Sequence, residues 1–316
     1  MVAHLVESTA DAEWVTWADR LHLTEMHPRL ATFVQNTTNR NLAGQATRTL
    51  LAADGTALLA EAWQSAAEPQ QIALVHGLQA SGRAEALPML QTFWQNAKLP
   101  MLVRSELTKA LGSWPEGQRF LLQHLAGGNF PEDLRYPAAN VLLTSSDPSI
   151  RDEAAKYVAM PSGAGERPLP PLAELVQRQG DRQAGEVVFS GVGTCAKCHR
   201  VAGQGTEVGP DLSQVGGKLS VESLYESILN PSAGISHNFE MYKVILVDGR
   251  TLSGVLLSQT SQEIVLKDKD AVVSTLPAAE VEELTQQQKS LMPDDLQKLL
   301  TEQQLVDLVT YLRSLK

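Results

Sequence analysis

The stretch Cys195-Ala196-Lys197-Cys198-His199 decides how the rest of the chain is interpreted, because it contains both cysteines of the 316 residues. Two thiols separated by two residues and followed by a histidine form the attachment signature of a c-type haem. One helical turn spaces the thiols to match the two vinyl groups of the porphyrin, to which each thiol adds. The imidazole of His199 then falls under the iron and can ligate it. The spacing therefore predicts one covalently bound haem c.

Three other hypotheses for the cysteine pair have less support from the sequence. A structural zinc site needs about four protein ligands, and this stretch offers fewer. A redox dithiol of the thioredoxin type is expected at a helix start after a buried strand, and no such strand is predicted before Cys195. A disulfide across two residues would be strained. Covalent haem is therefore the favoured hypothesis, with a redox dithiol as the alternative.

The composition is that of a globular protein with an acidic surface. Charged residues make up 20% and hydrophobic residues 43%. The length suggests about two domains of ~150 residues. The formal net charge of -10 argues against nucleic acid as the main partner and favours a redox partner protein of basic or mixed charge. No unbroken apolar run is long enough for a membrane span.

The first residues, Met1 to Trp14, do not form a signal peptide, since they carry acidic residues and have neither a basic segment nor an apolar core. Because c-type haem is attached outside the bacterial cytoplasm, we nevertheless expect a periplasmic or otherwise extracytoplasmic protein. Either the signal was removed, or the chain is a piece of a longer protein. The second explanation is favoured, because the start looks like an arbitrary point.

Residues 13–159 follow a helical pattern, in which apolar residues recur at spacings of three and four. Four apolar sets end at leucines roughly thirty residues apart, the scale of a helix-pair repeat. These leucines are Leu50, Leu78, Leu111 and Leu142. The region loosely resembles a HEAT-type α-solenoid, and the resemblance implies a scaffold or a docking surface for a partner. An irregular helical bundle is the alternative.

A stretch rich in proline and glycine, residues 161–177, predicts a stiff linker between a helical domain at 1–160 and a second domain at 178–316. The order of motifs in the second domain resembles class I cytochrome c. In that fold the first and last helices cross at a glycine and an aromatic residue. The resemblance implies that Gly185 and Phe189 face the last helix.

Two further motifs extend the resemblance to class I cytochrome c. In Gly209-Pro210-Asp211-Leu212 it implies that the carbonyl of Pro210 accepts a hydrogen bond from His199 and orients the ring. In Ser290-Leu291-Met292-Pro293 it implies that the sulfur of Met292 is the sixth ligand of the iron. Two rivals for that position stay open: His237, at the edge of an insertion, and Met241, in a strand-like run.

The insertion, at about residues 235–284, has a pattern of short strands. The segments rich in β-formers are Tyr242 to Val247, Leu252 to Leu257, Glu263 to Leu266 and Ala271 to Leu276. Asp248-Gly249 is a strong hairpin turn. Four or five short strands with small turns predict a small β-barrel, similar to SH3-like or Sm-like barrels.

Several motifs occur in the order found in the PVC-type haem-binding domain, a family of planctomycete and verrucomicrobial proteins. They are CAKCH, VGPDL, SLYESILNPS, VDGRTLSGVL, SLMPDDL and DLVTYLRSL. The chain resembles this family from about Arg178 to Lys316. The resemblance implies a preceding HEAT-like region, and in that family the domain often ends a large protein that also contains a propeller-type sugar dehydrogenase.

Together these features predict a mostly α-helical chain, with a HEAT-like α-solenoid followed by a class I cytochrome c fold that carries an inserted small β-barrel. The expected function is single-electron transfer from a dehydrogenase domain or partner to an acceptor. The chain itself would then be an electron-transfer protein rather than an enzyme, or a fragment of a larger dehydrogenase. The alternative is a haem protein that binds or senses O2, NO or CO, because the long insertion before Met292 could make that ligand labile.

Overall fold

The structure, a computed structural model, describes residues 11–316 apart from residues 22 and 54. The prediction about a signal peptide falls mainly on residues 1–10, which lie outside the described residues. The chain divides into two compact units, Met1–Val158 and Ala159–Lys316. No helix in the described part of the chain is long and apolar enough to cross a membrane.

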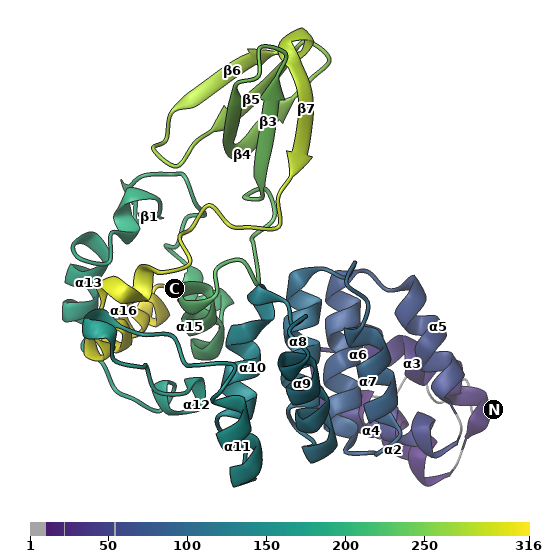
Figure 1. The fold of residues 1–316 in the computed structure, drawn as a ribbon. Coiled ribbons are helices and arrows are strands. Elements are labelled where there is room, and N and C mark those ends of the chain that lie inside the picture. Colours follow the sequence, from purple (N-terminus) through teal and green to yellow (C-terminus); the bar gives the residue numbers. More distant parts are fainter. Residues whose placement is uncertain (1–10, 22, 54) are drawn as a thin grey trace. The chain divides into compact units, whose positions relative to one another are not determined.

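The first unit consists of helices joined by short turns, as the apolar spacing predicts (Figure 1). The first backbone amides of a helix have no partner within the helix, and the Asn39 side chain accepts hydrogen bonds from two of them at the start of one helix. Two other helices begin with Pro115 and Pro148 in the first turn, where proline has no amide to leave unpaired. The helices are α2 (Asp11–Arg20), α3 (His27–Asn36), α4 (Arg40–Ala52), α5 (Thr56–Ser65), α6 (Glu68–Ser81), α7 (Ala86–Trp94), α8 (Met101–Leu111), α9 (Pro115–Ala126), α10 (Arg135–Leu142) and α11 (Pro148–Ala154), with short turns η1 (Thr24–Met26) and η2 (Glu132–Leu134).

These helices lie in two layers. In one layer, α4 contacts α6, α6 contacts α8, and α8 contacts α10, while in the other α3 contacts α5, α7 contacts α9, and α9 contacts α11. The four leucines that end the apolar sets, Leu50, Leu78, Leu111 and Leu142, are all 0% exposed and all lie in the first layer. The spacing in the sequence therefore corresponds to successive helices of one layer.

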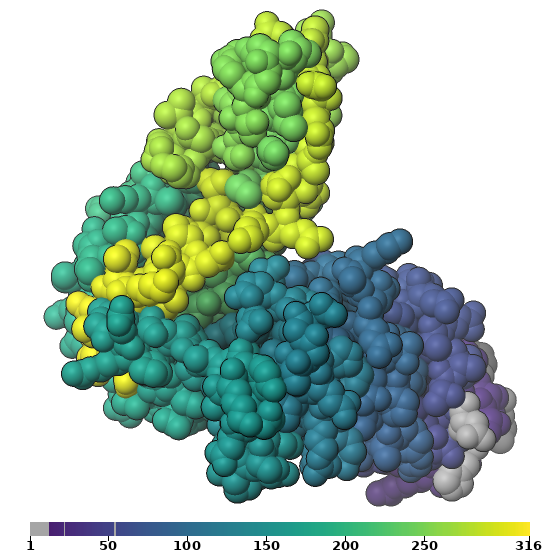
Figure 2. Space-filling model, in the orientation of Figure 1, coloured from purple at the N-terminus to yellow at the C-terminus, as the bar shows by residue number. Residues whose placement is uncertain are grey.

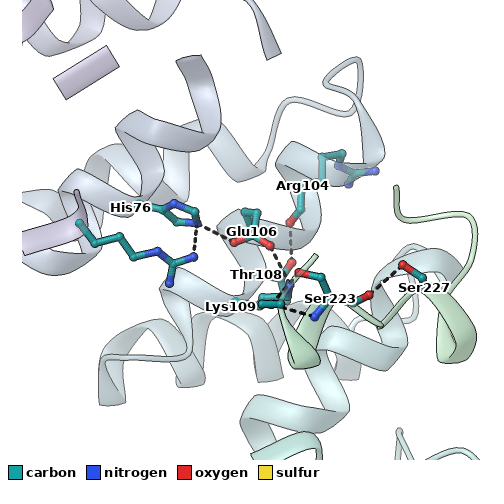
Figure 3. A network of polar contacts seen from close by, with 9 residues as sticks. His76, Arg104, Glu106, Thr108, Lys109, Ser223 and Ser227 are labelled. Carbon is teal, nitrogen blue, oxygen red and sulfur yellow. Dashed lines mark hydrogen bonds and ion pairs between the residues drawn. The ribbon is translucent and has the colours of Figure 1, made fainter. Parts of the chain in front are cut away.

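A polar network links three helices of this first layer (Figure 3). His76 Nε2 lies 2.8 Å from Glu106 Oε2, and Lys109 Nζ lies 2.7 Å from the other carboxylate oxygen. Arg40 of α4 lies 3.1 Å from the same ring nitrogen of His76. Burial raises the pKa of Glu106, but the hydrogen bonds and charges of His76 and Lys109 outweigh burial and lower this pKa from 4.5 to about 2.

We expect Glu106→Gln to destabilise the first unit most strongly at neutral pH. A carboxyl group whose pKa is lowered by folding stabilises the folded state above its ordinary pKa and loses this contribution as the pH falls toward about 2. At pH 7 the variant should lose about 2–3 kcal/mol of unfolding free energy, and the difference should shrink below about pH 4. Denaturation at several pH values, followed by tryptophan fluorescence, measures this unit, since Trp14, Trp17, Trp63, Trp94 and Trp114 all lie in it.

The control is Glu116→Gln, because Glu116 is exposed and its ion pair with Arg119 spans 3.9 Å. A solvated pair of this kind contributes little, so this variant should follow the wild type at every pH. A pH-independent difference between Glu106→Gln and wild type would contradict the assignment.

The second unit is built on the crossing of α13 (Arg182–Ser190) and α16 (Glu302–Ser314). A Cβ atom on Gly185 would lie 2.0 Å from the carbonyl oxygen of Asp307, so only glycine permits this approach. The rings of Phe189 and Tyr311 lie 5.6 Å apart at the same crossing. The predicted crossing at a glycine and an aromatic residue is therefore confirmed.

Gly185→Ala should force the two helices apart and lower the unfolding free energy of the second unit by about 1–3 kcal/mol, the range for overpacked cores. Gly217→Ala is the matched control, because a Cβ atom there would meet nothing within 4 Å. Alanine should be neutral or slightly stabilising at that exposed helical position. Denaturant titration followed by circular dichroism measures both, and equal stability of the two variants would refute the close crossing.

The rest of the helical part of this unit is made of short elements. They are η3 (Ala164–Glu166), α12 (Leu172–Leu175), η4 (Cys195–Lys197), β1 (Arg200–Val201), β2 (Gln204–Gly205), α14 (Val215–Lys218), α15 (Val221–Leu229) and η6 (Leu296–Leu299). The proline-rich segment 161–177 folds onto this unit: Leu169 and Leu175 are buried, and the Ala164 amide donates to the carbonyl of Leu300 at 2.8 Å.

The insertion forms a five-stranded antiparallel sheet in the order β6-β5-β4-β3-β7 (Figure 1). Its elements are β3 (Met241–Leu246), β4 (Thr251–Gln259), β5 (Glu263–Lys267), β6 (Val273–Pro277), η5 (Ala278–Glu280) and β7 (Val281–Gln286). The four predicted strands are confirmed, and a fifth, β7, pairs with β3 and takes the insertion past residue 284. In this order β6 and β7 are the two edges of the sheet.

Candidate cofactor site

The two cysteines and the histidine of the attachment motif project from a single helical turn. The motif follows α13, and the chain enters η4 through Thr194, whose φ of 55° is in the left-handed region. The amides of Cys198 and His199 both donate to the carbonyl of Cys195, at 3.0 and 2.9 Å. The backbone itself therefore sets the spacing of the three side chains.

The ring of His199 is held in one orientation. Its Nδ1 atom lies 2.9 Å from the carbonyl oxygen of Pro210. Because a carbonyl oxygen can only accept, Nδ1 carries the proton and Nε2 is left as the lone-pair donor. Burial lowers the pKa of His199, opposed by this hydrogen bond, so the neutral imidazole that a metal requires is favoured. A Cβ atom on Gly209 would lie 2.5 Å from His199 Cε1, so glycine makes room for the ring.

Both thiols are free and half-buried. Burial raises the pKa of Cys195 to about 11, and burial together with the nearby Asp270 carboxylate raises the pKa of Cys198. Both groups are therefore protonated near pH 7. Within the described residues, no group of three or more His, Cys, Asp or Glu side chains is placed to hold a metal ion.

A cavity of about 730 Å³ brings together every site residue predicted from the sequence. Its lining includes Cys195, Cys198, His199, Pro210 and Met292. The remaining lining is largely apolar and includes Phe189, Val208, Leu212, Leu224, Ile228, Leu308 and Leu312. The volume lies within the ~300–1,000 Å³ of cofactor pockets. Two thiols, an oriented imidazole, a thioether and apolar walls fit a covalently attached haem.

The three candidates for the sixth ligand are placed differently. Met292 lines the cavity and is half-buried, and its amide donates to Ser290 Oγ at 3.1 Å. The side chain of His237 is 88% exposed, lies 3.4 Å from the carboxylate of Glu240 and is not part of the cavity lining. Met241 lies on β3 and is likewise outside this lining.

The β insertion also contributes to the cavity, which the sequence did not indicate. Val255 of β4 and the turn residues Lys269 and Asp270 are part of the lining. Lys267 Nζ donates to the carbonyl oxygen of Glu207 at 2.7 Å, which ties the β5–β6 hairpin to the loop after the attachment motif. In the sequence, the hairpin tip has the composition of an ordinary charged turn, so no local signal marks this role.

Comparison with known protein families supports a haem site in the segment around the attachment motif. Residues 182–244 match the family model of cytochrome c. No curated protein matches the chain. The chain therefore contains a cytochrome c domain, which indicates haem-based electron transfer.

Proposed function

We propose that the chain is a monohaem c-type cytochrome module that passes single electrons from a dehydrogenase domain or partner protein to an acceptor. The observation that carries this proposal is the single cavity lined by both cysteines, His199 and Met292. Cys195 and Cys198 would hold one haem c through thioether bonds, and His199 Nε2 and the Met292 sulfur would ligate its iron.

The chain's own residues account for the expected behaviour. When bound, the haem supplies the one-electron iron couple. If His199 and Met292 both ligate the iron, no position would stay open for a substrate, and the thioether would favour a high reduction potential. Pro210 keeps Nε2 of His199 directed into the cavity and raises its basicity. With haem bound, the largely apolar lining would limit the water near the iron, so little solvent would have to reorganise when the charge of the site changes.

For the architecture, we propose a PVC-type haem-binding domain at 178–316 preceded by a HEAT-like solenoid at 1–160, with residues 161–177 as the connection. The two helix layers of the first unit support the solenoid. For the insertion we propose a small barrel, because Val244, Leu246, Ile264, Leu266 and Leu276 form one apolar core with residues of all five strands. A sheet that encloses its own core in this way must curl.

The chemistry of haem attachment suggests where the protein is located and what it meets there. Covalent haem is attached outside the bacterial cytoplasm, so we propose a periplasmic or other extracytoplasmic location. The partner is a redox protein or a fused dehydrogenase domain, and the net charge of -10 disfavours nucleic acid. The helical first unit would act as a scaffold or docking surface for that partner.

Optical spectroscopy with rapid mixing tests the electron-transfer proposal. The matured protein should show a six-coordinate low-spin haem in both oxidation states and should cycle quickly and reversibly with a chemical reductant and a partner cytochrome. The alternative is a small-ligand sensor, in which the thioether is displaced by O2, NO or CO. A five-coordinate high-spin resting spectrum, or immediate CO binding by the ferrous protein, would favour the sensor and refute the carrier.

A further inference from the structure

The two ends of the β insertion are joined at their base by a buried serine. Ser232, which follows α15, is 5% exposed. Its hydroxyl donates to Asp294 Oδ1 at 3.2 Å and accepts a hydrogen bond from the Ser290 amide at 3.2 Å. Ser290 Oγ in turn accepts the hydrogen bond from the amide of Met292. One side chain thus connects the outgoing chain to the Met292 loop, across a separation of 58 residues.

The hydrogen bonds of Ser232 lie where the insertion leaves and re-enters the helical part of the second unit. The chain leaves the helical part of the second unit after Ser232, forms five strands, and returns at Ser290. Figure 2 shows the returning segment (yellow) running along the surface from β7 toward α16. A long excursion leaves its ends free to separate unless a contact joins them. The Ser232 hydroxyl supplies such a contact two residues before Met292.

The cost of burying a hydroxyl group also favours a fixed contact between Ser232 and the segment that contains Met292. Ser232 is almost fully buried, so a hydroxyl without partners in the protein would be costly. It finds both a donor and an acceptor in the segment that contains Met292, namely the Ser290 amide and the Asp294 carboxylate. Removing the hydroxyl would leave a partly buried Ser290 amide without this acceptor.

We propose that Ser232 is a positioning residue for Met292: it clamps the base of the insertion and holds the methionine loop in the cavity wall independently of movements of the β-sheet. This inference rests on the proposed function, in which Met292 is the sixth ligand. It adds that coordination depends on a side chain far upstream, whose loss makes the thioether labile.

Four variants test the clamp. Ser232→Ala removes the hydroxyl. Asp294→Ala and Asp294→Asn form a matched pair at an exposed residue, because asparagine keeps the acceptor oxygen and alanine does not. Ser261→Ala, in the exposed turn between β4 and β5, is the control. In the full-length apoprotein, hydrogen exchange at the Ser290 and Met292 amides should be at least tenfold faster in Ser232→Ala, moderately faster in Asp294→Ala, and unchanged in the other two.

The matured protein gives a second readout. In Ser232→Ala, the weak absorption that marks sulfur bound to ferric iron should be diminished, the reduction potential should fall, and CO should bind the ferrous form faster. Wild-type exchange and absorption in Ser232→Ala would overturn the clamp, as would equal effects of Asp294→Ala and Asp294→Asn. If the wild type itself lacks the sulfur absorption, the proposed function fails instead, while the hydrogen-exchange result still decides whether the clamp exists.

Discussion

Replacing Cys195 and Cys198 together by alanine is expected to abolish covalent haem completely. The two side chains hold the only thiols of the chain, so no other thioether can form. Protein produced with a haem-attachment system should show the mass of the polypeptide plus one haem for the wild type and of the polypeptide alone for the double variant. Haem-stained denaturing gels give the same result independently, because only covalent haem survives denaturation.

Replacing Cys195 or Cys198 singly tests the contribution of each thiol to haem attachment. Each single replacement should leave one possible thioether and therefore a reduced yield of attached haem. Met292→Ala serves as the matched control, because it removes a residue of the same cavity without removing a thiol, and it should keep the full haem mass. If correctly matured wild-type protein shows only the bare polypeptide mass, the haem proposal is wrong, and the redox dithiol becomes the better explanation of the motif.

The second large effect is expected for Met292→Ala in the haem-loaded protein. Loss of the thioether should open the sixth position, so the ferric protein should become high-spin and the ferrous protein should bind CO at once. The reduction potential should fall by on the order of 100 mV, a fraction of the roughly 0.8 V that axial ligands span in haem proteins. Absorption spectra with and without CO, and a redox titration, measure these changes.

His237→Ala and Met241→Ala are the controls, because both residues were candidates for the sixth ligand and neither lies in the cavity lining. Both variants should keep the spectrum and the potential of the wild type. A loss of low-spin character in His237→Ala, with Met292→Ala unchanged, would instead assign bis-histidine ligation. That result would also require His237, whose side chain is 88% exposed, to move into the cavity.

Much of the architecture could be predicted because it is encoded over short distances in the chain. The apolar spacing located the helices of the first unit, and Asp248-Gly249 and the runs of β-formers located the strands of the insertion. The order of the sheet could not be predicted, because β7 pairs with β3 rather than with β6, and no local pattern specifies that choice. The four segments rich in β-formers therefore do not include β7 (Val281–Gln286), although the pattern allows for a fifth strand.

In the candidate site, too, the features set by neighbouring residues could be predicted, and those set by distant segments could not. The attachment turn was predictable because one helical turn determines the spacing of Cys195, Cys198 and His199, and the turn with Pro210 lies only a few residues further on. The motif around Met292 made it a candidate ligand, and Met292 lines the same cavity. The contributions of Lys269 and Asp270 to the cavity were not predictable, because a charged hairpin tip has the same sequence whether it meets solvent or a cavity wall.

The sequence by itself determined which chemical groups are available: two thiols and an imidazole in one turn, a methionine in a proline-containing loop, and the helices and strands that carry them. Only the tertiary structure decided which of these groups share a cavity, since that depends on contacts between segments far apart in the chain. Gly185 against Asp307, Lys267 against Glu207 and Ser232 against Ser290 are such contacts. They arise from packing and hydrogen-bond satisfaction in three dimensions, which a local pattern of residues does not record.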